Sequence, residues 1–272
     1  MNIIVCIKQV VDTNDIKWTK NNTIDREGVD CIINPCDLLA LETALRIKED
    51  LQNTQITVIS MGPLQAQEAL KTAIALGCDR AILLNDKKFS GADTVATSRT
   101  ISKAIELKCN NYDLIICGQY AIDGDTAQTG PSIAQKLNIE QITYVSEIKP
   151  FSQTPCKKIH AIRNAENKTE IVETPLPALI CVSDCPYVPR KILINGYIKA
   201  QDYKIEIFNA DDIGLSKEEI GIKGSPTWVS KAFRAQNNRL NKITENMASV
   251  DVIKKLTKYI TETTANLGVQ NE

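Results

Sequence analysis

The sequence contains one histidine, His160, and none of the common glycine-rich nucleotide-binding motifs. A single imidazole disfavours catalytic triads and most general acid–base schemes, because these rely on histidine. Neither G-x-G-x-x-G nor G-x-x-x-x-G-K-[ST] occurs, so the usual dinucleotide and P-loop fingerprints are absent. Redox chemistry would therefore need a bound cofactor. A phosphate group would have to be held at the N-terminus of a helix with free amides.

Long apolar runs and an excess of one charge are missing too. No apolar run approaches the roughly 20 residues that a membrane-spanning helix requires. The 32 Lys and Arg residues balance 33 Asp and Glu residues, so neither nucleic acid nor an anionic membrane is expected as a partner. The first residues, "NIIVCIKQV", are typical of a strand and not of a signal or transit segment. We therefore expect a cytoplasmic protein.

Cysteine is plentiful, but no two cysteines form a C-x-x-C pair, and with one histidine a zinc site is not expected. Several cysteines lie in apolar runs, where a reduced thiol acts as a small hydrophobic side chain. We therefore expect structural thiols and no metal. The cysteines are Cys6, Cys31, Cys36, Cys78, Cys109, Cys117, Cys156, Cys181 and Cys185.

Short, continuously apolar runs alternate with helical patterns in the first half of the chain. The runs predict buried parallel strands at 3–8, 56–61, 81–84 and 114–117. Helices are predicted at about 35–50, 63–76, 92–108 and 128–138. This alternation predicts an α/β fold with an open, mostly parallel, doubly wound sheet, whose ligands bind at the carboxyl ends of the strands.

The pattern changes after residue 140. "ITYVSEI", "KKIHAIR", "TEIVET" and "ALICVS" predict strands without long helices between them, which would extend the sheet in antiparallel pairs. From residue 184 the chain becomes irregular and rich in proline, and 238–264 predicts an amphipathic helix that packs on its own domain or on another chain. We therefore divide the chain into 1–183, 184–237 and 238–264.

The stretch "GQYAIDGDTAQTGP", residues 118–131, lies where the run "LIIC" passes into a helix. Gly124 allows close approach to the backbone, and Thr126, Gln128 and Thr129 offer hydrogen bonds. Pro131 fits only near a helix start, so the helix is expected to begin at Gln128 or Thr129. These features favour a phosphate-binding helix N-terminus. The alternative is a capped helix preceded by a loop without a ligand.

This stretch resembles the nucleotide loop of the beta subunit of electron-transfer flavoproteins. "CIKQVVDT", "INPCDLLALETALRIKE", "SMGPLQAQEALKTAIALGCDRAILL", "ETPLPALICV", "ADDIG" and "GIKGSPTWV" also resemble that family, in the same order, from residue 1 to about 230. The resemblance implies a Rossmann-like, adenine nucleotide-binding domain that pairs with an alpha subunit carrying FAD. With the apolar pattern of 238–264, the expected fold also includes a C-terminal arm ending in a helix.

The resemblance implies a set of cofactor-binding residues. Family members hold either AMP or a second FAD in the beta site, and "DGDTAQTG" is similar to the FAD-binding, electron-bifurcating class. Residues at the adenosine end would be Cys6, Asn34, Asp37 and Met61. Those at the ribose and phosphates would be Gln119, Asp123, Gly124, Asp125, Thr126, Ala127, Gln128, Thr129 and Gly130.

"GADTVATS", residues 91–98, resembles a segment that the bifurcating class associates with NADH. The residues implied are Gly91, Ala92, Asp93, Thr94 and Thr97. The longer stretch "SGADTVATS", residues 90–98, also predicts a capping box, in which Ser90 caps a helix and Asp93 follows three residues later. Both readings are compatible, because a capped helix N-terminus can also receive a pyrophosphate.

The function implied is electron transfer within a complex, with no catalytic acid or base in this chain. NADH would reduce FAD in the beta subunit. Electrons would then pass to the FAD of the alpha subunit and a flavin-dependent dehydrogenase for acyl-CoA or hydroxy acids, and to ferredoxin or flavodoxin. One alternative is a simple carrier with AMP in the beta site. The other is a nucleotide-binding module of the universal-stress type, without a redox role.

Two segments after residue 150 bear on partners. "RNAENKTE", residues 163–170, departs from the family's R-x-x-E-G-G-x-E hairpin, with Asn167 and Lys168 in place of its glycines, so the turn is expected to differ. "PRKILINGYIKA", residues 189–200, holds more apolar residues than a strand or long helix would absorb. The resemblance implies that Ile194 anchors the partner dehydrogenase there. Otherwise this stretch would be a loop packed onto its own core.

Overall fold

The computed structural model describes residues 1–12, 17–18, 24–25, 31–149, 158–230 and 248–266. The chain forms two compact units, Met1–Ala232 and Phe233–Glu272.

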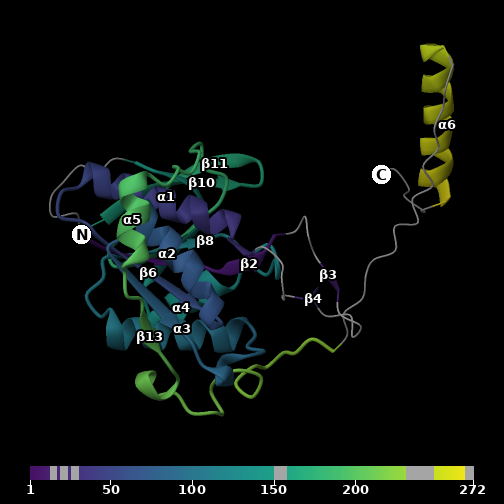
Figure 1. The fold of residues 1–272 in the computed structure, drawn as a ribbon. Coiled ribbons are helices and arrows are strands. Elements are labelled where there is room, and N and C mark those ends of the chain that lie inside the picture. Colours follow the sequence, from purple (N-terminus) through teal and green to yellow (C-terminus); the bar gives the residue numbers. More distant parts are fainter. Residues whose placement is uncertain (13–16, 19–23, 26–30, 150–157, 231–247, 267–272) are drawn as a thin grey trace. The chain divides into compact units, whose positions relative to one another are not determined.

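The first unit is built on a nine-stranded sheet, shown in Figure 1. The central strands are apolar on both faces, which is typical of a parallel sheet covered by helices on both sides. In the order in which they lie side by side, the strands are β11 (Lys168–Pro175), β10 (Lys158–Ala165), β9 (Glu140–Ile148), β12 (Ala178–Val182), β8 (Leu114–Gly118), β1 (Asn2–Cys6), β6 (Gln55–Met61), β7 (Arg80–Leu84) and β13 (Glu206–Phe208).

Helices cover both faces of this sheet. One core lies under α1 (Pro35–Asp50), α2 (Gln67–Leu76) and Ala200 of α5 (Ile194–Gln201). The other lies under α3 (Thr94–Lys108) and α4 (Thr129–Leu137). Figure 1 shows the two groups of helices on opposite sides of the strands. The first unit also contains the short 3-10 helices η2 (Leu64–Ala66), η3 (Lys87–Phe89) and η4 (Asp211–Ile213), and two small strand pairs, β2 (Gln9–Val11) with β5 (Cys31–Ile33) and β3 (Lys17–Trp18) with β4 (Ile24–Asp25).

The strand order reverses at β1. From β1 the chain builds β6 and β7 on one side, and then returns to place β8 on the other side of β1. Both neighbours are parallel to β1. At such a reversal the connections leave the carboxyl ends of the strands in opposite directions and open a crevice between them, where ligands of open α/β sheets bind.

The expected α/β class, with its open and mostly parallel sheet, is confirmed. All four predicted parallel strands and the helices α1 to α4 form, and η2 supplies the first turn of the segment predicted as one helix from 63. The antiparallel extension is confirmed for β9, β10 and β11, which form consecutive antiparallel pairs. The hairpin between β10 and β11 closes with Ala165 opposite Lys168, which leaves Glu166 and Asn167 as its turn.

Two parts of that prediction need correction. "ALICV" does not join the antiparallel extension, because β12 lies between β8 and β9 and is parallel to both. All five of its residues are buried, as expected for a central parallel strand. A further strand that the sequence analysis missed, β13, adds to the opposite edge of the sheet, parallel to β7.

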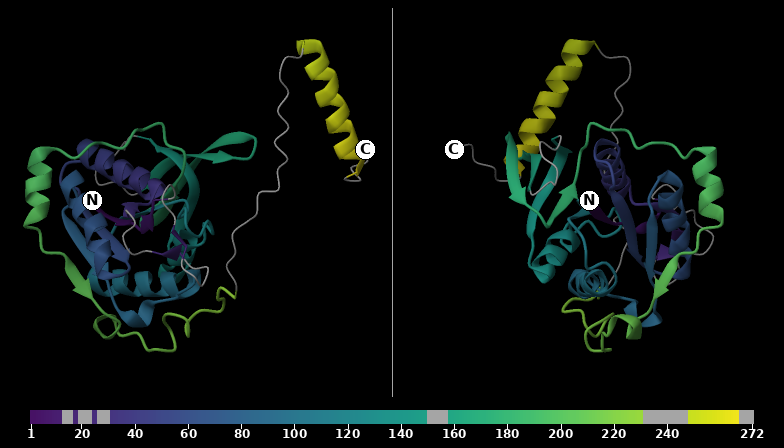
Figure 2. Two further views of the ribbon diagram at one scale, coloured as in Figure 1. Left: turned by 45° about the vertical axis from the view of Figure 1, so that its right-hand side comes forward. Right: turned by 90° about the vertical axis from the view of Figure 1, so that its left-hand side faces the viewer.

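The segment after residue 189 is also more regular than predicted. Ile194–Gln201 forms the helix α5, which packs along α2 and is visible on the outside of α2 in both views of Figure 2. Gly196 allows this contact, since a Cβ there would overlap the carbonyl oxygen of Ala75.

The second unit contains α6, Ser249–Asn266. Positions 238–247 of the predicted C-terminal helix lie outside the described residues, and within the described part the helix begins at Ser249. Its apolar residues Val250, Ile253, Leu256 and Ile260 are exposed. None of the helices in the described ranges is both long enough and apolar enough to cross a membrane.

Candidate functional site

The loop Gly118–Gln128 connects β8 to α4 at the point where the strand order reverses. Helix α4 begins at Thr129, with Gln128 as its N-cap, as Pro131 predicts. The Gln128 side chain makes no capping hydrogen bond, so the first amides of α4 remain available to another acceptor. These amides lie at the positive end of the helix dipole, which favours an anionic group.

The loop backbone carries strain near its end. Asp125 and Ala127 both have positive φ, +49° and +53°, although neither is glycine. Such conformations cost about 1–3 kcal/mol each, and they cluster at functional sites. Gly124 lies beside open space, because a Cβ placed there would meet no atom of the chain. The tip of the loop can therefore be approached closely by a ligand.

Asn34, the N-cap residue of α1, holds the middle of the loop. Its fully buried side chain donates to the carbonyl oxygen of Tyr120, at 2.8 Å, and accepts from the amide of Ile122, at 3.1 Å. Both ends of the Asn34 amide are thus bonded to the loop itself. The family resemblance predicts Asn34 at the adenosine end, and in the structure its side chain supports the loop that surrounds the candidate site.

Asp37 joins the start of α1 to the ends of two strands. Its buried carboxylate accepts from the amide of Lys8, at 2.7 Å, and from that of Gly118. A side chain at position 118 would overlap this carboxylate, so glycine is required there. Burial raises the pKa of Asp37 to about 7, and the hydrogen bonds from Lys8, Asn34 and Gly118 only partly oppose that effect.

A row of thiols forms the floor below α4. Cys6, Cys117 and Cys181 are register partners on the adjacent strands β1, β8 and β12. Gly130 rests on this row, since a Cβ there would come within 2.5 Å of the Cys181 sulfur. A hydrogen bond with Cys6 and burial raise the pKa of Cys117, and burial raises that of Cys181, so both stay protonated. No cluster able to hold a metal ion occurs among the residues that the structure describes.

The other predicted residues at this edge take different positions. Met61 ends β6, the neighbour of β1, and is partly buried there. Gln119 is buried, and its side-chain oxygen accepts from the amide of Tyr144, at 2.7 Å. Tyr144 has a φ of +57° and lies in an irregularity of β9. The side chain of Gln119 therefore holds a strained strand residue, and Tyr144 is a neighbour that the sequence analysis missed.

Helix α3 is capped by Asp93 and not, as predicted, by Ser90. The carboxylate of Asp93 accepts from the amides of Val95 and Ala96, at 2.9 and 3.0 Å. Its second oxygen accepts from the amide and the hydroxyl of Thr227, at 3.1 and 2.8 Å. Burial alone would raise the pKa of Asp93, but these hydrogen bonds outweigh it and lower the pKa. Asp93 thus caps α3 and also fastens the segment around Thr227.

The two predicted binding segments lie next to each other. The Thr94 hydroxyl donates to the side-chain oxygen of Gln128, at 3.0 Å, and the Ser98 and Ser132 hydroxyls are 2.7 Å apart. The N-terminal turns of α3 and α4 are therefore linked by their side chains. Gly91 has a φ of +73° and lies against Ile222, which covers that side of the segment. The amide of Thr97 belongs to the first turn of α3, where it donates to the carbonyl oxygen of Asp93.

The predicted docking residue lies away from this loop. Ile194 is the first residue of α5 and is 79% exposed, so it is not part of the core. Leu193, Tyr197 and Ile198 beside it are exposed as well. The alternative of a loop packed onto its own core is therefore wrong for these side chains.

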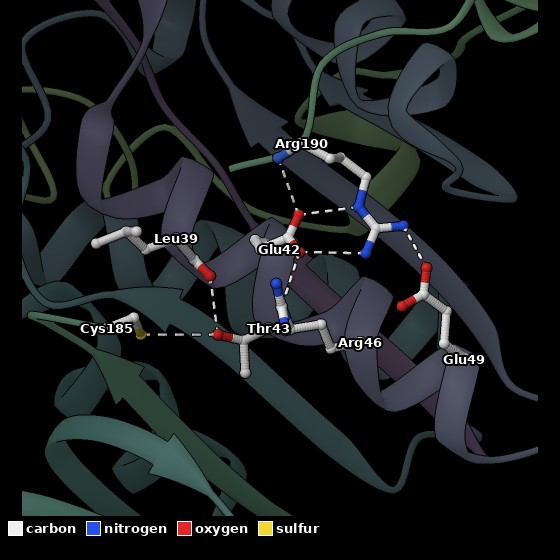
Figure 3. Close-up of polar contacts among 7 residues, drawn as sticks. All are labelled: Leu39, Glu42, Thr43, Arg46, Glu49, Cys185 and Arg190. Carbon is white, nitrogen blue, oxygen red and sulfur yellow. Dashed lines mark hydrogen bonds and ion pairs between the residues drawn. The ribbon is translucent and has the colours of Figure 1, made fainter. Parts of the chain in front are cut away.

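The segment before α5 is fastened to α1 by a network of charges, shown in Figure 3. The carboxylate of Glu42 accepts from the amide and guanidinium of Arg190 and from Arg46, at 2.8 to 3.2 Å. Arg190 also donates to Glu49, at 2.7 Å. Burial would raise the pKa of Glu42, but the hydrogen bonds from Arg190 lower it overall. The segment that leads into α5 is thus fastened to the surface of α1 at Arg190.

Comparisons with known proteins identify the family. The model of the electron transfer flavoprotein domain matches residues 21–213. The chain is 45% identical over 245 residues to the electron transfer flavoprotein subunit beta of Thermoanaerobacterium thermosaccharolyticum, covering 89% of this chain and 92% of that protein. It is also 45% identical to the caffeyl-CoA reductase-Etf complex subunit CarD of Acetobacterium woodii, and this match covers 86% of this chain and 87% of that protein.

A third relative, protein FixA of Sinorhizobium fredii, is 40% identical, and the match covers 86% of this chain and 83% of that protein. The chain belongs to the electron transfer flavoprotein family and is one of its beta subunits.

The titration of Asp37 gives the first prediction. Because the folded chain keeps this proton up to about pH 7, whereas the unfolded chain loses it near 3.8, the free energy of unfolding should fall as pH rises between these values. Each pH unit in that window contributes at most ~1.4 kcal/mol. Asp37→Asn cannot titrate and should flatten the slope, measured by urea unfolding at several pH values.

The control for this measurement is Asp202→Asn, which neutralises an exposed aspartate after α5 and should keep the wild-type slope. A slope that is unchanged in Asp37→Asn would show that another group is responsible.

Proposed function

We propose that this beta subunit binds FAD at the loop Gly118–Gln128 and takes part in the electron bifurcation that its sequence motifs suggest. The main support is the uncapped N-terminus of α4 at the strand-order reversal, combined with family membership. The amides of α4, with the hydroxyls of Thr126 and Thr129, would hold the phosphates. The open space beside Gly124 fits the close approach of such a group.

Bound flavin would supply the redox chemistry, by accepting a hydride from NADH and passing on its electrons. The chain itself would bind the flavin and NADH and orient them toward each other. The proposed NADH segment, Gly91 to Thr97, lies against the loop through the bond between Thr94 and Gln128, so NADH at this segment would lie next to a flavin at the loop. The proposed recipients are FAD of an alpha subunit, a flavin-dependent dehydrogenase for acyl-CoA or hydroxy acids, and ferredoxin or flavodoxin.

Names of relatives support a role in such a complex. CarD is by its name a subunit of a complex with caffeyl-CoA reductase. AMP in the beta site of a simple carrier remains the second candidate, because the same amides would bind either phosphate group. Family membership disfavours the third candidate, a universal-stress module without a redox role.

Cofactor content tests the proposal directly. The chain should be purified together with its alpha subunit, and the released nucleotides should be separated and counted. We expect two FAD per heterodimer. One FAD with one AMP would support the simple carrier, and a preparation without flavin would contradict a redox role.

The proposed NADH segment gives a second prediction. Thr94→Val removes the hydroxyl that joins α3 to Gln128, and should slow reduction by NADH about fivefold, since one such hydrogen bond contributes ~1 kcal/mol. Stopped-flow absorbance of the complex measures this rate. Thr72→Val removes a similar hydroxyl from α2 and should have no effect. If a Thr94→Val complex with full flavin content is reduced by NADH at the wild-type rate, the segment Gly91 to Thr97 is only the start of a helix and does not bind NADH.

The proposed dehydrogenase anchor gives a third prediction. Ile194→Ala should leave stability and flavin content unchanged, because the side chain is exposed. It should weaken transfer to the partner dehydrogenase at least tenfold, because burying one aliphatic side chain contributes about 1.5–3 kcal/mol. The rate is measured against dehydrogenase concentration. Ile171→Ala shortens another exposed isoleucine, in the hairpin, and should behave as wild type. Equal transfer rates for both variants would show that the docking surface lies elsewhere.

A further inference from the structure

The loop Gly118–Gln128 presents a problem of charge. It contains two aspartates, Asp123 and Asp125, next to the helix N-terminus where a phosphate would bind. Two carboxylates repel a phosphate at short range, and the amides of α4 carry only about half a positive charge between them. A cationic side chain at the loop would remove this conflict.

One lysine meets that requirement. The ammonium group of Lys8 lies 2.5 Å from the carboxylate of Asp123. Among the described residues, no other ion pair reaches the loop. Lys8 was absent from the predicted site residues, although it stands in "CIKQVVDT", one of the stretches that carry the family resemblance.

The position of Lys8 is fixed by its backbone. Its amide donates to Asp37, at 2.7 Å, and its carbonyl oxygen accepts from the amide of Asn34, at 2.9 Å. Asn34 in turn holds Tyr120 and Ile122 of the loop. Lys8 therefore stands just beyond the carboxyl end of β1, at a fixed place beside the loop, while its long side chain can still change partner.

The pair with Asp123 contributes little to the fold. The Lys8 side chain is 46% exposed, and exposed ion pairs typically stabilise a protein by less than about 1 kcal/mol. A phosphate carries more charge than a carboxylate and offers more oxygens, so it would compete well for the same ammonium group. Asp123 then takes the place of a phosphate oxygen in the chain alone.

We propose that Lys8 is a phosphate-binding residue of this site, and that it exchanges the carboxylate of Asp123 for the phosphate of the bound nucleotide. This inference rests on the nucleotide site proposed above. The exchange leaves Asp123 able to accept a hydrogen bond from a ribose hydroxyl. Together with the amides of α4, Lys8 then distinguishes a nucleotide from its nucleoside.

The test compares AMP with adenosine, which differ only in the phosphate. Calorimetric titration of the nucleotide-free, full-length chain gives both dissociation constants, and their ratio isolates phosphate recognition. Lys8→Met should lower the preference for AMP about tenfold or more and leave adenosine binding within about twofold, since a charged hydrogen bond is lost. Lys8→Arg should restore most of the preference.

Two further variants separate the inference from general effects. Lys103→Met removes one charge from α3, where Lys103 pairs with Glu106, and should keep the wild-type ratio. Asp123→Asn removes the competing carboxylate and should raise the preference for AMP. Equal loss of AMP and adenosine binding in Lys8→Met would make Lys8 a support of the loop and overturn the inference, as would an unchanged ratio. If the wild-type chain binds neither compound, the nucleotide site itself is wrong, and the role of Lys8 with it.

Discussion

The buried side-chain amide of Asn34 is the contact on which the candidate site depends. The side chain forms hydrogen bonds with two loop residues, Tyr120 and Ile122. The backbone amide of Asn34 donates to the carbonyl oxygen of Lys8, and its backbone carbonyl oxygen accepts from amides in the first turn of α1. A buried amide is stable only when its polar atoms are paired, so these contacts support one another. One residue, through its side chain and its backbone, thus joins the end of β1, the start of α1 and the loop after β8.

Much of the fold could be predicted because the central strands are uniformly apolar. The same uniform apolarity marks β12 as a central parallel strand, and the prediction that β12 joins the antiparallel extension overlooked it. "ALICV" is apolar throughout, like the parallel strands, whereas β9 and β11 carry polar residues along their length. The local sequence predicts β13 and α5 only weakly. β13 has three residues, and α5 contains Asn195 and Gly196, which are weak helix formers.

The candidate site was predictable only where its determinants are local. Pro131 places the start of α4, and the acidic, glycine-containing loop predicts a place for a ligand. The partners of individual side chains depend on residues far away in the sequence, such as Thr227 for Asp93 and Tyr144 for Gln119. Ser90 was mistaken for the cap because residue spacing cannot show that the carboxylate of Asp93 reaches two amides of its own helix.

Helix α1 connects the proposed nucleotide site to the proposed docking surface. Asn34 and Asp37 at its start hold the loop and the strand ends, and Glu42 and Glu49 further along hold Arg190 before α5. The α1 face between them is packed into the core, so this helix cannot shift without loss of buried contacts. Removing Arg190 alone would leave the buried carboxylate of Glu42 paired only with Arg46, which costs more than the lost ion pair contributes. The exposed side chains of α5 are therefore linked to the nucleotide loop through α1 and Arg190, in addition to the packing of α5 on α2.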